Sequence, residues 1–335
     1  TDDDRVIQTR PVENASQYTF VTVEAMMARY MRDKDASYAR ECLAAAVRGY
    51  DWCRANMTGK EYDAGVSGSA LLAALELYKA TGERKYKDFT YEMADRIVSL
   101  QVDPARDGLS PGGFFRLTPD GDTYYSEIAR CDFAFTGLCE LVDAFPDETA
   151  GKYKESIRRY CDEYLAFLAD KNAFGLLPYA VYSTPDAPVR RAGRYGYRYF
   201  MDPSLDWWVG INANIAGKGV ALIRASRLLN DPGLSARAQR QLDWIFGANP
   251  LGTCTMRGVG YEHPAFADAF YKDAERPGSE FFPPTPHIPG AVLNGIGGDV
   301  DDIPQMIPGG WQTGEYWTPM VGLTLWLMAE LTVLP

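Results

Sequence analysis

Apolar and small residues recur at three- and four-residue spacing along most of this 335-residue chain. This spacing is typical of helices with one apolar face, and no period-two alternation is long enough to predict a strand ladder. Several helical stretches are joined by polar breaks of only four residues, such as DKDA at 33–36 and NDPG at 230–233. Links this short produce antiparallel helical hairpins. The predicted helices cover about 15–33, 36–57, 64–80, 84–101, 127–145, 148–170, 207–230, 233–247 and 316–333.

Long loops rich in Gly, Pro and aromatic residues separate the hairpins, at about 102–126, 171–206 and 248–315. Short turns then lie at one end of the hairpins and the long loops at the other, where functional residues concentrate. Two stretches, 64–78 and 210–223, carry the small residues that allow helices to approach closely. We therefore expect an all-α protein in which an inner ring of helices is wrapped by an outer ring. A plain helical bundle is the alternative.

Composition excludes several classes of partner and site. The formal net charge of −11 argues against binding to nucleic acid, which needs an excess of Lys and Arg. No apolar run approaches the roughly 20 residues that span a bilayer, so no membrane partner is expected. The chain has two histidines and no CxxC pair, so we expect no zinc site.

Three stretches of the chain resemble parts of a known family, and they occur in the same order along the sequence as in that family. Residues 206–264 run from DWWVGINANIAGKGVALI to an NPLG turn at 249–252, followed by a G-x-G at 258–260. This is similar to the late part of the family nine glycoside hydrolases. Residues 14–53, with YARECLAAA, and residues 65–88, with GVSGSALLAALELYKATGERKYKD, look like earlier parts of the same family. The resemblance covers most of the chain.

The resemblance implies a fold of six helical hairpins, an (α/α)6 toroid of twelve helices, with the nine helices here as its fourth to twelfth. Residues 1–335 are then a single catalytic-type domain that is incomplete at its N-terminus, and a further N-terminal domain or chain completes the barrel. It also implies a cellulase-like hydrolase that acts on an oligo- or polysaccharide with β linkages. We expect a secreted or periplasmic protein whose signal peptide has been removed.

Members of this family are inverting hydrolases, and the resemblance implies two carboxylates. An Asp in a DAGD motif near the N-terminus serves as base, and a Glu at the start of the last helix serves as acid. No DAGD occurs here; YDAGVSG at 62–68 shares three letters but precedes a later hairpin, so the base lies outside this chain or is replaced. In GGWQTGEYWTPMVG (309–322), Glu315 stands four residues before Pro319, whereas the family pattern has its Glu about eight before, where Trp311 stands. Glu315 is the predicted acid; the alternative is a charge favoured by the helix dipole.

Candidate sugar contacts come from loops and helix starts. His287 lies where the family has a PHHR motif, and tryptophans near inner helices could stack on sugar rings. Asn214, near the start of an inner helix, could bind a hydroxyl group. Each candidate has a structural alternative: a loop hydrogen bond for His287, core packing for the aromatic rings, and helix capping for Asn214. The predicted substrate-binding residues are His287, Trp207, Trp208, Asn214, Tyr197 and Trp311.

Two further loops leave alternatives open. APVRRAGRYGYRYF at 187–200 is the one dense basic and aromatic stretch, which could bind carboxylated or sulfated sugars or form internal salt bridges. GIGGDVDDIP at 295–304 places Asp299, Asp301 and Asp302 on a Gly-rich loop that could bind Ca²⁺, the one cofactor considered, or supply a replacement base.

Three functions therefore remain open: a hydrolase that uses Glu315, a non-catalytic carbohydrate-binding homologue, and a lyase on uronate polysaccharides with a Tyr as base.

Overall fold

The structure is a computed structural model that describes residues 14–103, 107–120, 132–149, 151–183, 190–204, 207–264 and 288–332. It divides into two compact units, Thr1–Ile97 and Val98–Pro335. That residues 1–335 form a single domain stays a prediction. No described helix combines the length and the apolar character needed to cross a membrane.

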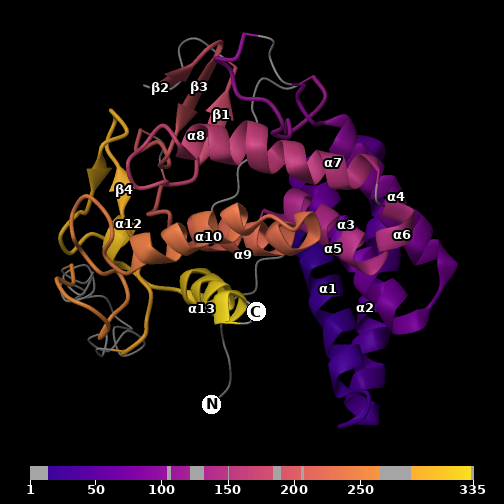
Figure 1. Ribbon diagram of the computed structural model, residues 1–335. Coiled ribbons are helices and arrows are strands. Elements are labelled where there is room, and N and C mark those ends of the chain that lie inside the picture. Colours follow the sequence, from indigo (N-terminus) through magenta and orange to yellow (C-terminus); the bar gives the residue numbers. More distant parts are fainter. Residues whose placement is uncertain are drawn as a thin grey trace. The chain divides into compact units, whose positions relative to one another are not determined.

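The first unit is built from α1 (Asn14–Met31), α2 (Ala36–Asn56), a 3₁₀ turn η1 (Gly59–Glu61), α3 (Ala64–Thr81) and α4 (Arg84–Ser99), whose last residues enter the second unit (Figure 1). The helix α1 packs against both α2 and α3. Asp35 begins α2 by accepting hydrogen bonds from the backbone N–H groups of Ser37 and Tyr38. The hairpin predicted from the short polar break at 33–36 is therefore present.

The second unit carries the remaining helices, and α9 is central to it (Figure 1). Almost every side chain in the first four turns of α9 is buried, and α9 packs against α5, α10 and α13. Its small residues allow this, since a Cβ at Gly219 would lie 2.9 Å from a methyl of Leu327 in α13. The helices are α5 (Phe133–Ala144), α6 (Pro146–Thr149), α7 (Lys152–Arg159), the π-helix η2 (Tyr160–Ala166), α8 (Phe167–Ala169), α9 (Asn212–Leu229), α10 (Pro232–Ile245), α12 (Trp311–Gly314) and α13 (Thr318–Thr332).

Short strands occur in the long loops, where the sequence predicted none. The strands β1 (Ala180–Tyr182), β3 (Tyr195–Arg198) and β2 (Arg190–Ala192) form an antiparallel sheet in that order, with Val181 opposite Tyr197. A second ladder pairs β4 (Gly297–Gly298) with β5 (Pro304–Gln305). Strands of two to four residues are too short to show a period of two, so the sequence could not predict them; the fold class is still all-α.

The three long loops meet within the second unit. The backbone N–H of Arg194 donates to Ser110 Oγ at 3.1 Å, which joins the loops at 102–126 and 171–206. Arg190 Nε donates to Asp302 at 2.6 Å, which joins the loops at 171–206 and 248–315. These two hydrogen bonds show that the three long loops lie together, as expected.

A buried polar cluster lies in the helical core of this unit. The Tyr160 hydroxyl donates to the Asp132 carboxylate, and Lys218 Nζ donates to the carbonyl oxygens of Pro178 and Tyr179. Burial lowers the pKa of Lys218 to about 8, while the Asp132 carboxylate acts in the opposite direction. Lys218 lies in the middle of α9, so its ammonium group is part of the packed core.

Lys218 should therefore add to stability as the pH rises above 8. An unfolded Lys keeps its proton up to about 10.5, whereas folded Lys218 loses it near 8, so the unfolded state binds more protons at this group between these values. This contribution increases the free energy of unfolding by at most about 1.4 kcal/mol per pH unit. Buried thiols act in the opposite sense, since burial raises the pKa of Cys53 to about 11, so the test compares variants with the wild type. In urea unfolding at several pH values, Lys218→Met should lose stability relative to the wild type as the pH rises, whereas the exposed control Lys152→Met should keep a constant difference. A constant difference for Lys218→Met would contradict this.

Candidate active site

The segment around Asn294 joins the start of α9 to the junction between α12 and α13. The backbone N–H groups of Ile211 and Asn212 donate to the carbonyl oxygens of Ile296 and Asn294, at 3.2 and 3.1 Å. The N–H of Gly210 donates to the carbonyl of Gln312 at 2.9 Å. These bonds hold residues 210–212 before the helix, so α9 begins at Asn212 and not at the predicted 207.

Asn294 is fully buried and fixes three residues of the α12–α13 junction. Its backbone N–H donates to the carbonyl oxygen of Glu315 at 2.7 Å, and its Nδ2 donates to the carbonyl of Trp311 at 2.8 Å. Its Oδ1 accepts a hydrogen bond from Nε1 of Trp317 at 2.5 Å. Asn294 therefore holds the backbone of Trp311 and Glu315 and the side chain of Trp317 at this junction.

Glu315 itself lies in extended backbone directly after α12, with φ −77° and ψ 156°. Its N–H donates to the Trp311 carbonyl at 3.3 Å, and its side chain is half-buried. The predicted position was the start of the last helix, but α13 begins at Thr318. Glu315 thus stands in the short link that precedes α13, with a carboxyl group that is partly accessible to solvent.

Two tryptophans from different elements stack beside this junction. The ring of Trp207, which precedes α9, lies 6.4 Å from that of Trp311 in α12, with an angle of 29° between the ring planes. Trp207 is 46% exposed and Trp311 is half-buried. Because Asn294 holds the backbone of both Trp311 and Glu315, the structure brings together three of the predicted site residues: Glu315, Trp207 and Trp311.

Three other predicted sugar contacts are buried, which corrects the prediction for their side chains. Trp208 is 8% exposed and lies under β4, where a Cβ on Gly297 would be 2.5 Å from its ring. Tyr197 is buried in β3 with its ring against Tyr199, and Asn214 is buried in the first turn of α9. Core packing thus explains the two aromatic side chains. His287 lies outside the described residues.

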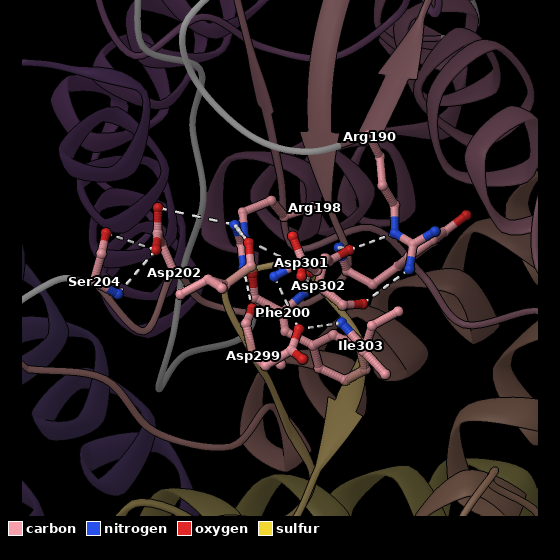
Figure 2. A network of polar contacts seen from close by, with 12 residues as sticks. Arg190, Arg198, Phe200, Asp202, Ser204, Asp299, Asp301, Asp302 and Ile303 are labelled. Carbon is pink, nitrogen blue, oxygen red and sulfur yellow. Dashed lines mark hydrogen bonds and ion pairs between the residues drawn. The ribbon is translucent and has the colours of Figure 1, made fainter.

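The acidic loop at 295–304 is organised around Asp302, which is fully buried (Figure 2). One carboxylate oxygen accepts from Arg190 Nε at 2.6 Å and from the N–H of Tyr199 at 3.0 Å. The other accepts from the N–H of Phe200 at 3.1 Å and lies 3.6 Å from Arg198 Nε. Oδ1 of Asp299 accepts from the N–H groups of Asp301 and Ile303.

Asp302 does not fit a calcium site as it stands, because both of its carboxylate oxygen atoms are already used by internal donors. A calcium ion held by the other aspartates of this loop stays a prediction. No group of three metal-ligating side chains occurs among the described residues. Asp302 is also unsuited to act as a base, since two guanidinium groups and two N–H groups surround it. The loop at 295–304 instead fastens the β2–β3 sheet to the segment that follows Asn294.

Side chains of the basic and aromatic loop at 187–200 also form internal hydrogen bonds. Arg198 Nη2 donates to the Asp299 carbonyl at 2.8 Å, and the Tyr199 hydroxyl donates to the Leu168 carbonyl at 2.7 Å. Burial raises the pKa of Tyr182 to about 12 and also raises the pKa of Tyr199. Neither tyrosine is thus suited to act as a base, and these contacts disfavour the lyase.

Asn294 is the site residue that the sequence did not single out. It occurs as VLNGIGG in a long loop, and nothing local distinguishes it from a turn asparagine. The same is true of buried Asn212 at the start of α9, whose Nδ2 donates to Thr255 Oγ1 and to the Leu293 carbonyl. A buried amide that satisfies distant backbone groups can be identified only when the tertiary contacts are known.

Comparison with known proteins shows which family the sequence matches. A sequence model of Glycosyl hydrolase family 9 matches residues 3–303. Endoglucanase D of Acetivibrio thermocellus is 22% identical over 266 residues, which cover 76% of this chain and 35% of that protein. The chain therefore spans about a third of the length of this curated relative.

Solved structures show the fold. Cellulase Cel9M of C. cellulolyticum matches with a TM-score of 0.61 at 17% identity, over 96% of this chain and 64% of that one. A thermostable endoglucanase from Alicyclobacillus acidocaldarius matches with a TM-score of 0.64 at 21% identity, over 99% and 58%. The fold class is that of an (α/α)6 toroid, as predicted.

Proposed function

Since the chain belongs to glycosyl hydrolase family 9, we propose that it hydrolyses glycosidic bonds in β-linked glucans. Supporting this, the matched relatives are named endoglucanase and cellulase, and Cel9M has been solved in complex with cellobiose. The proposal takes an oligo- or polysaccharide as the substrate. A new reducing end after incubation with cello-oligosaccharides is the expected product.

We assign the general acid to Glu315, and one observation carries this assignment. Its backbone is held by fully buried Asn294, which also holds Trp311 of the stacked tryptophan pair. A carboxyl group at this half-buried junction can donate a proton to a glycosidic oxygen once a sugar binds there. The proton moves from Glu315 to the leaving oxygen as the bond to the anomeric carbon breaks.

Inversion requires a second carboxylate that activates water on the opposite face of the sugar, about 6.5–9.5 Å from the acid. Asp63, in the YDAG stretch, is engaged as the N-cap of α3, where it accepts from the N–H of Val66 at 2.8 Å. Asp302 is paired with arginines. We therefore propose that the base is another carboxylate, in the part of the family fold that this chain does not span.

Trp207 and Trp311 are the proposed stacking platform for a sugar ring. Trp207→Ala should weaken binding of cello-oligosaccharides by about 1 kcal/mol or more, roughly fivefold in Kd, because a large exposed apolar ring is lost. Isothermal titration measures the change. The control is Trp52→Ala, which removes a tryptophan of similar exposure from the other unit. If the Trp207 variant and the wild type bind with equal affinity, Trp207 and Trp311 do not form a stacking platform for the sugar.

A further inference from the structure

A small polar cavity lies in the second unit, and the proposed hydrolysis uses none of its lining residues. Its volume is about 260 Å³, and residues from the end of α4, from the loop at 102–126 and from the turn between β2 and β3 line it. The charged side chains in this lining are Arg116, Arg194 and Asp103. The cavity therefore brings together two guanidinium groups that are far apart in the sequence.

The backbone beside both arginines is fixed by hydrogen bonds. The N–H of Arg116 donates to the carbonyl oxygen of Leu100 at 2.9 Å. The N–H of Arg194 donates to Ser110 Oγ, and the N–H and hydroxyl of Ser110 donate in turn to Asp107 at 2.9 and 2.8 Å. Both side chains thus line the cavity from anchored backbone, so little backbone order has to be gained when a ligand binds.

Both guanidinium groups keep N–H donors available for a ligand. Arg116 makes one long hydrogen bond, from Nη1 to the carbonyl oxygen of Pro119 at 3.4 Å. The guanidinium group of Arg194 lies over the ring of Tyr195, with Cζ 4.9 Å from the ring centroid, a contact that occupies its face and not its N–H groups. Among the residues that the structure describes, no carboxylate forms an ion pair with either arginine.

The acidic side chains near the cavity have other partners or face solvent. Asp103 pairs with Arg159, with 3.2 Å between Oδ1 and Nη2. Asp107 accepts from backbone N–H groups of its own loop, and these bonds, with a smaller contribution from Arg194, lower its pKa. Asp120 is exposed. The described acidic side chains therefore leave the two lining arginines open to an anion from solution.

We propose that this cavity binds the carboxylate group of an acidic sugar residue and forms a second glycan-binding site. A carboxylate is the planar anion that matches the donor fork of a guanidinium group. Pockets for drug-sized ligands have volumes of about 300–1,000 Å³, so a cavity of about 260 Å³ holds one sugar residue and not several. That the anion belongs to a glycan rests on the proposed function, whereas the preference for an anion follows from the arginines.

Two tetrasaccharides with the same β-1,4 linkage test this proposal by isothermal titration: cellotetraose and the tetramer of glucuronate, which differ in their carboxylate groups. Arg116→Gln and Arg194→Gln should each raise Kd for the glucuronate tetramer about tenfold, because a charge-assisted hydrogen bond is lost. Neither variant should change Kd for cellotetraose. The control is Arg84→Gln, which removes the same charge from a side chain that is 90% exposed in α4 and should change neither Kd.

Three outcomes would overturn the proposal. Equal Kd for the glucuronate tetramer in the wild type and in both cavity variants would place the carboxylate elsewhere. Equal losses of affinity for both tetrasaccharides would show that the arginines support the fold and do not recognise the carboxylate. Binding of sodium sulfate without binding of the glucuronate tetramer would show a site for inorganic anions only. Failure of the proposed function is a separate result, since cellotetraose that yields no new reducing ends would leave the measured uronate binding unchanged.

Discussion

Replacing Glu315 with Gln should lower the rate of glucan hydrolysis by about 10²–10⁴-fold, the typical contribution of a general acid. The amide keeps the size and hydrogen bonding of the side chain but has no proton to give to the leaving oxygen. The backbone contacts of residue 315 with Asn294 and Trp311 do not involve the side chain, so the junction should keep its geometry. Initial rates with cello-oligosaccharides measure the loss, and Kd for the same ligands should stay close to the wild-type value.

The matched control is Asp301→Asn, which makes the same change from carboxylate to amide at an exposed position of the 295–304 loop. This variant should hydrolyse at the wild-type rate. Wild-type activity in Glu315→Gln together with loss of activity in Asp301→Asn would move the acid to that loop. Glucan binding with no hydrolysis by the intact wild-type protein would favour the non-catalytic carbohydrate-binding homologue.

The second large effect is on stability: Asp302→Ala should lower the free energy of unfolding by about 3–5 kcal/mol, the usual cost of removing one partner of a buried ion pair. The change removes the acceptor of the N–H groups of Tyr199 and Phe200, and it removes the buried negative charge beside Arg198, which is 2% exposed. Asp302 also has a φ of 59°, which Ala adopts less readily than Asp. Denaturation by urea at neutral pH measures the difference.

The control for this prediction is Asp301→Ala, next along the chain, which removes an exposed carboxylate from the same loop. We expect a change within about 0.5 kcal/mol, as for most surface substitutions. Similar effects of the two variants would mean that the Asp302 contacts in Figure 2 contribute little to stability.

The helices could be predicted because their signal is local and repeated. In α10, for example, Asp231 caps the first turn through the N–H of Gly233, and buried Leu234, Ala238, Leu242 and Ile245 follow at helical spacing. The strands β4 and β5 have no such signal, since two residues cannot show a period. The late start of α9 depends on backbone bonds to residues about 80–100 positions further along the chain.

The candidate site was predictable only in part, for the same reason. Glu315 and Trp311 lie in a stretch with a recognisable pattern. The burial of Trp208, by contrast, depends on β4 folding over its ring. Asn294 acts through contacts with Trp311, Glu315 and Trp317, about 20 residues away, that no local pattern records. Residue type indicated the chemistry, and long-range packing decided which side chains are accessible.

The stereochemistry of the product is the most direct test that this protein is an inverting β-glucan hydrolase. Proton NMR of cello-oligosaccharides mixed with the protein resolves the two anomers before they interconvert. Inversion at a β linkage requires the α-anomer to appear first, with new reducing ends, and the Glu315→Gln variant should produce neither. The β-anomer as the first product would show retention, and an unsaturated sugar would show a lyase; either result would contradict the proposed mechanism.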